Sequence, residues 1–214
     1  MVERQLRRRG VTDERVLSAM GAVPREHYVP DAERERAYDD QALPIGFGQT
    51  ISQPWIVAAM CSALQLQGHE RVLEVGAGMG YSTAVLARLC DEVTAIERVG
   101  ELSGEAARRL AAARVQNASV IEADGSVGLP AEAPFDAIAV NAAAPSPPPS
   151  LLSQVGHDGR LVMPVASGGI DMLSLYRRTG SRSASAGTED TFEVDEIGPC
   201  RFVPLIGAEG FASE

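Results

Sequence analysis

The sequence contains no lysine, because all 19 of its basic residues are arginine. Schiff-base catalysis by a lysine is therefore excluded, and so is a P-loop, whose lysine contacts nucleotide phosphates. No apolar run approaches the roughly 20 residues that a membrane-spanning helix requires. Aromatic residues make up only 5% of the chain, whereas the hydrophobic share of 45% is ordinary for a globular protein.

Positive charge is scarce as well. The 214 residues include 29 acidic and 19 basic side chains, which gives a formal net charge of −10. A protein this acidic has no general attraction to nucleic acid or anionic lipid, so we expect neither as a partner. The isolated thiols Cys61, Cys90 and Cys200 predict no disulfide framework and no metal site. They are typical of a reducing compartment such as the cytoplasm, where we expect a monomer.

Short apolar runs alternate with helical patterns from residue 71 onward. We expect strands at 71–75, 93–97, 118–124, 135–140 and 159–164, and helices at 81–89, 101–113 and 151–155. This alternation predicts an α/β fold with a mostly parallel sheet, in a single domain of residues 1–214. The segments 172–177 and 192–197 predict an antiparallel C-terminal hairpin with a mobile loop at 179–188. A last edge strand is expected at 202–206, since it contains a proline.

The first 65 residues or so are expected to form a helical segment packed on this core. A partial apolar stripe predicts a helix over residues 3–22, and its members are Leu6, Val16, Leu17 and Met20. Thr12 or Asp13 would cap a second part of this helix. Residues 31–53, which contain Tyr38, Pro44, Gly46 and Gly48, are predicted to be mostly loop.

A glycine loop follows the strand at 71–75, in the stretch Leu73-Glu-Val-Gly-Ala-Gly-Met-Gly80. Glycine lets the backbone turn sharply and approach a ligand closely. The spacing G-x-G-x-G differs from the dinucleotide fingerprint G-x-G-x-x-G, and a glycine loop alone is also typical of a tight turn. Its place between a strand and a helix, directly after Glu74 and Val75, favours a nucleoside site.

Acidic residues end the next two predicted strands. Glu97 can accept hydrogen bonds from both ribose hydroxyls, and Asp124 can accept one from the exocyclic amine of adenine. The backbone amide of Gly125 can donate to a ring nitrogen. Each acid alone is typical of a solvated strand end, but together they lie where open α/β sheets bind ligands. A nucleoside with a sulfonium and no phosphate fits the glycine spacing, which favours S-adenosylmethionine over NAD.

Further stretches extend this pattern, and with them the chain resembles the protein-L-isoaspartate O-methyltransferase family. The stretches are 23–30, the hallmark-like 38–54, 72–84, 96–98, 124–125, 133–140, 142–145, 159–164 and 201–205. The resemblance implies a Rossmann-like, S-adenosylmethionine-dependent methyltransferase. It also implies methyl transfer to the α-carboxylate of an L-isoaspartyl residue in a damaged protein or peptide. The ester then cyclises to a succinimide, whose hydrolysis returns some normal aspartate.

The resemblance also implies roles for particular residues. Ser52 would lie where the cofactor meets the acceptor carboxylate. Without the resemblance, a helix N-cap is the favoured role of Ser52, since Pro54 follows it, and both roles can hold together. The implied cofactor-binding residues are Glu74, Gly76, Gly78, Gly80, Glu97, Asp124 and Gly125. The implied contacts to the peptide substrate are Thr50, Ile51, Gln53, Pro164, Val165, Phe202, Val203 and Pro204.

Three positions depart from the family's usual pattern. Asn141 stands where a threonine is usual, and Ala166 and Asp171 alter a stretch beside the expected substrate groove. Two alternatives therefore stay open, namely an enzyme that methylates an aspartate in a peptide natural product to form an aspartimide, and a non-catalytic nucleoside-binding protein. For either acceptor, a carboxylate is already ionised at neutral pH and needs no general base. The chemistry then requires alignment of the reactants and exclusion of water.

Overall fold

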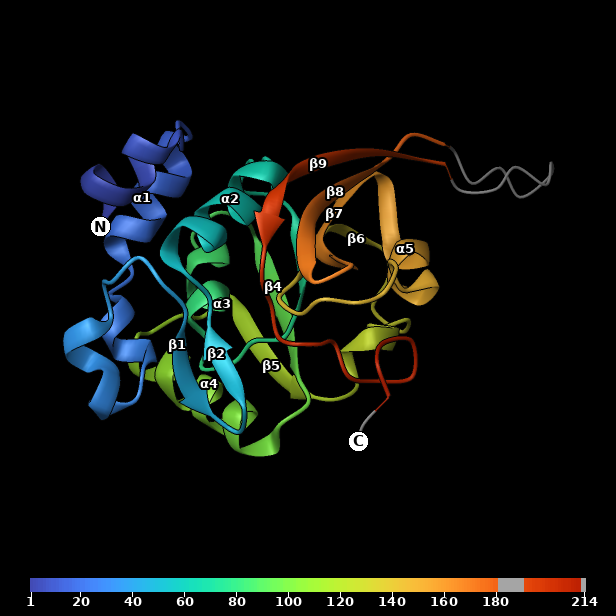
Figure 1. Cartoon of the computed structure of the whole chain (residues 1–214). Coiled ribbons are helices and arrows are strands. Elements are labelled where there is room, and N and C mark those ends of the chain that lie inside the picture. Colours follow the sequence, from blue (N-terminus) through green and yellow to red (C-terminus); the bar gives the residue numbers. More distant parts are fainter. Residues whose placement is uncertain (181–190, 213–214) are drawn as a thin grey trace.

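The computed structural model describes residues 1–180 and 191–212 (Figure 1). Within them, a seven-stranded sheet has the order β5-β4-β3-β6-β7-β8-β9. The strands are β3 (Arg71–Val75), β4 (Glu92–Glu97), β5 (Ala118–Glu122), β6 (Phe135–Val140), β7 (Val155–Ser167), β8 (Ile170–Arg178) and β9 (Phe192–Cys200). The pairs from β5 to β7 are parallel, and β8 and β9 add antiparallel pairs. The predicted fold class is confirmed. Residues 181–188 of the predicted mobile loop lie outside the described residues.

Alternate residues of the parallel strands face two separate hydrophobic cores. Val72 and Ala137 belong to one core, and their neighbours Leu73 and Ile138 belong to the other. Burial on both faces explains why these strands are continuous apolar runs in the sequence. The helices that cover the sheet are α2 (Pro54–Leu64), α3 (Tyr81–Leu86), α4 (Gly100–Ala112) and α5 (Pro149–Gln154). In the described parts of the chain, no helix has the length and apolarity to cross a membrane.

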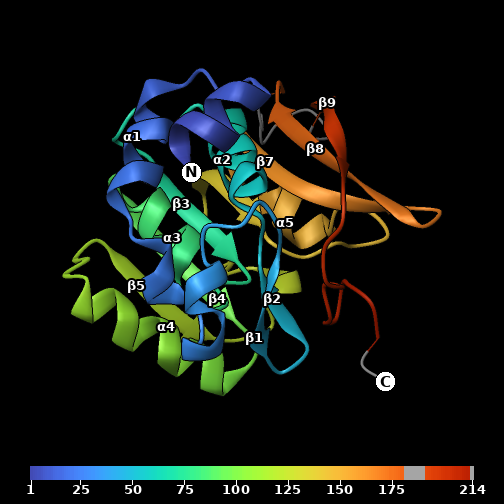
Figure 2. The same cartoon turned by 60° about the vertical axis from the view of Figure 1, so that its left-hand side comes forward.

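The N-terminal segment is helical but broken, so the prediction of one helix over residues 3–22 is wrong. Helical turns over residues 2–9 end at Gly10, whose φ of 88° is left-handed, and α1 (Glu14–Ala22) begins after it. Asp13 caps α1 as predicted, because its Oδ1 accepts from two first-turn N–H groups at 2.9 and 3.2 Å. The predicted apolar stripe is buried, and α1 packs against α2 and α3 (Figures 1 and 2).

The segment predicted to be loop-rich contains a β-hairpin instead. Strands β1 (Leu43–Gly46) and β2 (Gln49–Ile51) pair antiparallel. The turn residues between them, Phe47 and Gly48, have φ values of 53° and 70°, and type I′ hairpin turns require positive φ at both positions. Leu43 and Ile45 of β1 are buried, so the hairpin is fixed to the core beside the carboxyl ends of β3 and β4 (Figure 2).

The predicted edge strand at 202–206 is also wrong. The segment crosses the chain just after β6, where Ala143 N–H donates to the Val203 carbonyl at 2.9 Å and Leu205 N–H donates to the Ala143 carbonyl at 2.7 Å. Pro204, between them, has no N–H to extend a ladder, so a single bridge forms. The segment therefore closes over the end of the sheet rather than adding a strand to its side.

Candidate active site

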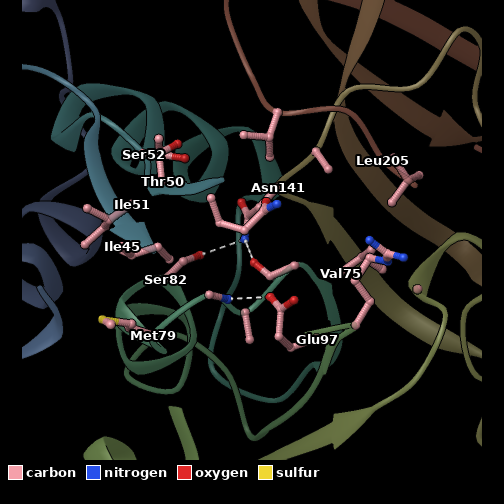
Figure 3. A pocket seen from close by; sticks show the side chains of 18 of the residues that line it. Ile45, Thr50, Ile51, Ser52, Val75, Met79, Ser82, Glu97, Asn141 and Leu205 are labelled. Carbon is pink, nitrogen blue, oxygen red and sulfur yellow. Dashed lines mark hydrogen bonds between the residues drawn. The ribbon is translucent and has the colours of Figure 1, made fainter. Parts of the chain in front are cut away.

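A cavity lies at the carboxyl ends of the central strands. The sheet order reverses between β3 and β6, and open α/β sheets bind ligands at such a switch point. Three continuous segments form much of the lining, namely residues 49–52 around the end of β2, residues 75–79 with the glycine loop, and residues 203–206 (Figure 3). The site thus combines the carboxyl ends of the central strands with segments from early and late in the sequence.

The three glycines of the loop have different roles. Gly76 and Gly78 line the cavity, both with positive φ. A Cβ on Gly78 would lie 3.1 Å from Ile45 Cδ1, so the loop fits closely under the β1–β2 hairpin. Gly80, which we expected to bind the cofactor, does not line the cavity. It packs against α4, where a Cβ would lie 3.4 Å from Ala106 Cβ, and it therefore serves helix packing.

Glu97, at the end of β4, is buried and lines the cavity. Its Oε2 accepts from Gly78 N–H at 2.9 Å (Figure 3). Its Oε1 accepts from Val99 N–H at 3.0 Å. A carboxylate oxygen has two acceptor directions, so each oxygen keeps one for a ligand. A pair of hydroxyl donors, such as a ribose diol, suits this acceptor set.

Glu74 lies behind the glycine loop rather than in the cavity. It is fully buried and accepts from Thr83 Oγ1 at 2.5 Å and from Asn141 Nδ2 at 2.8 Å. Burial raises the pKa of Glu74 to about 6, although these hydrogen bonds oppose the shift. Asn141 does line the cavity, and it also donates to the Gly76 carbonyl at 3.1 Å (Figure 3). Glu74 therefore orients Asn141 and the loop, which is a supporting role.

Asp124 and Gly125 follow β5, and only Gly125 lines the cavity. Asp124 Oδ1 accepts from the N–H and the hydroxyl of Ser126, at 2.9 and 2.7 Å, and Oδ2 accepts from Ala208 N–H at 2.8 Å. Partial burial raises the pKa of Asp124, but these hydrogen bonds outweigh it and the net shift is downward. At position 125 a Cβ would collide with the Val75 side chain. Only glycine therefore lets the backbone at this position stay close to β3.

Residues 50–52 form the side of the cavity away from Glu97, with Asn141 between them (Figure 3). Within the described residues, the Ser52 hydroxyl has no hydrogen-bond partner in the protein. The N-cap of α2 is Gln53, so the alternative role of Ser52 as a helix cap is wrong. Gln53, expected to contact the peptide, instead donates to the carbonyl and carboxylate of Asp40, both at 2.8 Å, and does not line the cavity.

Residues 203–206 form what we call the C-terminal wall of the cavity, and only some of the residues expected to contact the peptide belong to the lining. Val203 and Pro204 line the cavity as expected, whereas Phe202, Pro164 and Val165 do not. Sequence reasoning missed the other lining residues, namely Ile45, Gln49, Val57, Val75, Ala77, Met79, Tyr81, Ser82, Ile96, Arg98, Asn141, Ala142, Leu205 and Ile206. Most of them are next to a predicted site residue in the sequence, and this adjacency is the signal that could have identified them.

Asp171, one of the unusual residues, has a structural role. Its Oδ2 accepts from the Phe202 N–H at 2.8 Å, which fixes the start of the C-terminal wall. Ala166 is its partner across the β7–β8 hairpin. The anchoring of this segment explains the departure at Asp171, and nothing in the structure explains the departure at Ala166.

Solved structures define the class of protein. The chain is similar to a putative protein-L-isoaspartate O-methyltransferase from Plasmodium falciparum in complex with S-adenosyl-L-homocysteine, with a TM-score of 0.76, 24% identity and coverage of 94% of both chains. A second structure, titled protein-L-isoaspartate O-methyltransferase, has a TM-score of 0.81 and 24% identity, and the match spans 95% of this chain but only 64% of that one. The fold is that of a Rossmann-like methyltransferase.

Sequence comparison defines the family. The profile of the family described as Protein-L-isoaspartate(D-aspartate) O-methyltransferase matches residues 1–210. Protein-L-isoaspartate O-methyltransferase 1 of Rhodopseudomonas palustris (strain HaA2) is 52% identical over 100% of this chain and 84% of its own length. The corresponding protein of Methanoculleus marisnigri is 45% identical over 100% and 93%. The chain belongs to the protein-L-isoaspartate(D-aspartate) O-methyltransferase family, as the resemblance predicted.

Proposed function

We propose that the protein transfers a methyl group from S-adenosylmethionine to the α-carboxylate of L-isoaspartyl residues in damaged proteins and peptides. The family match over residues 1–210 carries this proposal. The cavity agrees with it, because Glu97 and the glycine loop lie on one side and residues 50–52 on the other. Spontaneous cyclisation of the ester to a succinimide, followed by hydrolysis, would return part of the damaged residue to aspartate.

The residues of the cavity fit an adenine nucleoside. Glu97 offers one free acceptor direction on each carboxylate oxygen, which matches the two ribose hydroxyls. Gly76 and Gly78 let the backbone come close to the ligand, and Gly125 keeps the end of β5 open beside them. When bound, S-adenosylmethionine supplies a methyl group on a positively charged sulfonium.

The side chains opposite Glu97 would receive the acceptor. The Ser52 hydroxyl is half-buried in the lining and can donate a hydrogen bond to a carboxylate oxygen. Ile51 and Leu205 add apolar walls that exclude water from the reacting groups. Since the substrate carboxylate is ionised at neutral pH, the chain has only to orient it, and Ser52 is the residue we assign to that task.

The alternative of a dedicated peptide-tailoring enzyme depended on Asp171 and Ala166. Because Asp171 is bonded to the Phe202 backbone, its presence supports no special acceptor. The alternative of a non-catalytic nucleoside-binding protein has no structural feature in its favour. Repair of isoaspartyl residues is therefore the function that the site supports best.

The proposal is tested with isoaspartyl and aspartyl forms of several unrelated short peptides and a labelled methyl donor. Methylation of the isoaspartyl forms alone supports it, whereas methylation of aspartyl forms, or of none, contradicts it. Ser52→Ala should lower turnover by about tenfold or more while donor affinity stays within about threefold, since one orienting hydrogen bond is lost. Ser18→Ala, on the exposed face of α1, is the matched control. Full turnover of Ser52→Ala would remove Ser52 from the acceptor site.

We also propose that residues 1–214 act as one domain and as a monomer in the cytoplasm, without a nucleic-acid or membrane partner. The net charge of −10 and the free thiols of Cys61, Cys90 and Cys200 support this. Light scattering coupled to gel filtration measures the molar mass in solution and therefore tests whether the protein is a monomer.

A further inference from the structure

The chain makes a tight turn directly after the C-terminal wall of the cavity, and we call residues 207–210 the C-terminal latch. Its backbone is bonded to the loop after β5, because Ala208 N–H donates to Asp124 Oδ2 at 2.8 Å and Glu209 N–H donates to Ser126 Oγ at 3.0 Å. Ser126 is fully buried, and a Cβ on Gly207 would collide with both Asp124 and Ser126. The latch is therefore fitted closely against this loop.

The side chain of Glu209 joins the latch to the first turn of α5, the helix that follows β6. Its Oε2 accepts from Ser150 N–H at 2.9 Å, and its Oε1 accepts from Ser150 Oγ at 2.5 Å. Both residues are half-buried, so solvent weakens this paired contact only in part. Glu209 thus ties together segments that follow two different strands of the sheet.

The latch directly follows two residues that line the cavity, Leu205 and Ile206. Beyond the latch the chain returns on itself, and Phe211 N–H donates to the Leu205 carbonyl at 2.7 Å. On its other side Leu205 is bonded to Ala143, as described above. Ile206 also borders a surface recess that contains Arg98 and Asp124, so it lies between this recess and the cavity.

We propose that the C-terminal latch closes the nucleoside end of the cavity, and that Glu209 is a positioning residue for binding of the methyl donor. Ile206 shares the lining with Arg98 and Gly125, the residues next to Glu97 and Asp124, which marks this as the end where the base would lie. Glu209 contacts neither the methyl donor nor the peptide. It acts by holding Ile206 as a fixed wall of the cavity. The inference rests on the proposed function, since it assumes that the nucleoside is S-adenosylmethionine or its product.

The test compares two substitutions at Glu209 by calorimetry with S-adenosylhomocysteine. Glu209→Ala removes both bonds to Ser150 and should raise the Kd by about tenfold. Glu209→Gln can keep both, because its amide oxygen can accept from Ser150 N–H while its amide nitrogen donates to Ser150 Oγ, and its Kd should equal that of the unchanged protein. Glu35→Ala, at an exposed glutamate that does not line the cavity, is the control and should bind as the unchanged protein does.

Steady-state kinetics with an isoaspartyl peptide separate a positioning role from general damage. Glu209→Ala should raise the KM for the donor by about tenfold while kcat and the KM for the peptide stay within about twofold. An unchanged Kd, or an equal loss of kcat, would overturn the proposal. If Glu209→Ala does not fold, Ser150→Ala decides, since it removes the hydroxyl half of the contact. A Kd raised by about threefold supports the latch, and an unchanged Kd refutes it.

Binding of S-adenosylhomocysteine to the unchanged protein distinguishes failure of the proposed function from failure of the latch. If the unchanged protein does not bind S-adenosylhomocysteine, the assigned donor is wrong. If it binds and Glu209→Ala binds equally well, only the latch is wrong.

Discussion

Replacement of Glu74 by glutamine should change the pH dependence of folding stability. Burial raises the pKa of Glu74 from its ordinary 4.5 to about 6, so the folded state holds this proton more tightly than the unfolded state does. The resulting stabilisation is complete below pH 4.5 and is lost as the pH rises through about 6. Above that pH, the folded protein must keep an ionised carboxylate in its core.

The rise in pKa sets the size of the effect. A displacement from 4.5 to about 6 corresponds to a loss of about 2 kcal/mol in the free energy of unfolding between acidic and neutral pH. Glutamine has no proton to lose and suits the site, because its oxygen can accept from Asn141 and its nitrogen can donate to Thr83 Oγ1. The variant should therefore lack this part of the pH dependence.

Urea unfolding at a series of pH values between about 4.5 and 7.5 measures the effect. The free energy of unfolding of Glu74→Gln, relative to the unchanged protein, should rise by about 2 kcal/mol across this range. Other carboxyl groups titrate in both proteins and cancel in the difference. Glu35→Gln, at an exposed site, should show no such trend. A difference that stays constant with pH would refute the reasoning about burial.

Three further results are expected. Glu97→Gln places an amide nitrogen against a backbone N–H, so S-adenosylhomocysteine affinity should fall by about 1–3 kcal/mol in calorimetry, and an equal Kd would exclude Glu97 from the site. Gly125→Ala forces a Cβ into Val75 and should lower the melting temperature, with partial recovery in the double variant that also carries Val75→Ala; no recovery would contradict the clash. Asp13→Ala removes the cap of α1 and should cost about 1 kcal/mol of stability in urea unfolding with donor affinity unchanged, and unaltered stability would argue against the cap.

The fold was predictable where the hydrophobic pattern alone determines the structure. The strand at 71–75 was predicted with its observed bounds, because a parallel strand buried on both faces is a continuous apolar run. The hairpin at 43–51 was missed, since Pro44, Gly46 and Gly48 indicate loop, and its two short strands exist because Leu43 and Ile45 are buried against the rest of the protein.

The site was predictable by position along the chain but not by the direction of each side chain. Glu97, Gly76 and Gly78 line the cavity as expected. Glu74, in the same motif, is directed into the core, and this follows from its register in β3 rather than from its type. Leu205 and Ile206 were missed because their position depends on the turn that follows them.

The two sides of the cavity also differ in when they can fold during translation. The glycine loop, Glu97 and Gly125 fall within one continuous stretch, 71–125, which can organise from contacts between neighbouring elements. The acceptor side joins residues 49–52 to residues 203–205, so it closes over a long intervening chain and at a larger entropic cost. A nascent chain can therefore form the part of the nucleoside half that residues 71–125 supply while still on the ribosome. The acceptor side and the Ile206 wall of the nucleoside end are complete only when residues 203–206 have been translated and released from the exit tunnel.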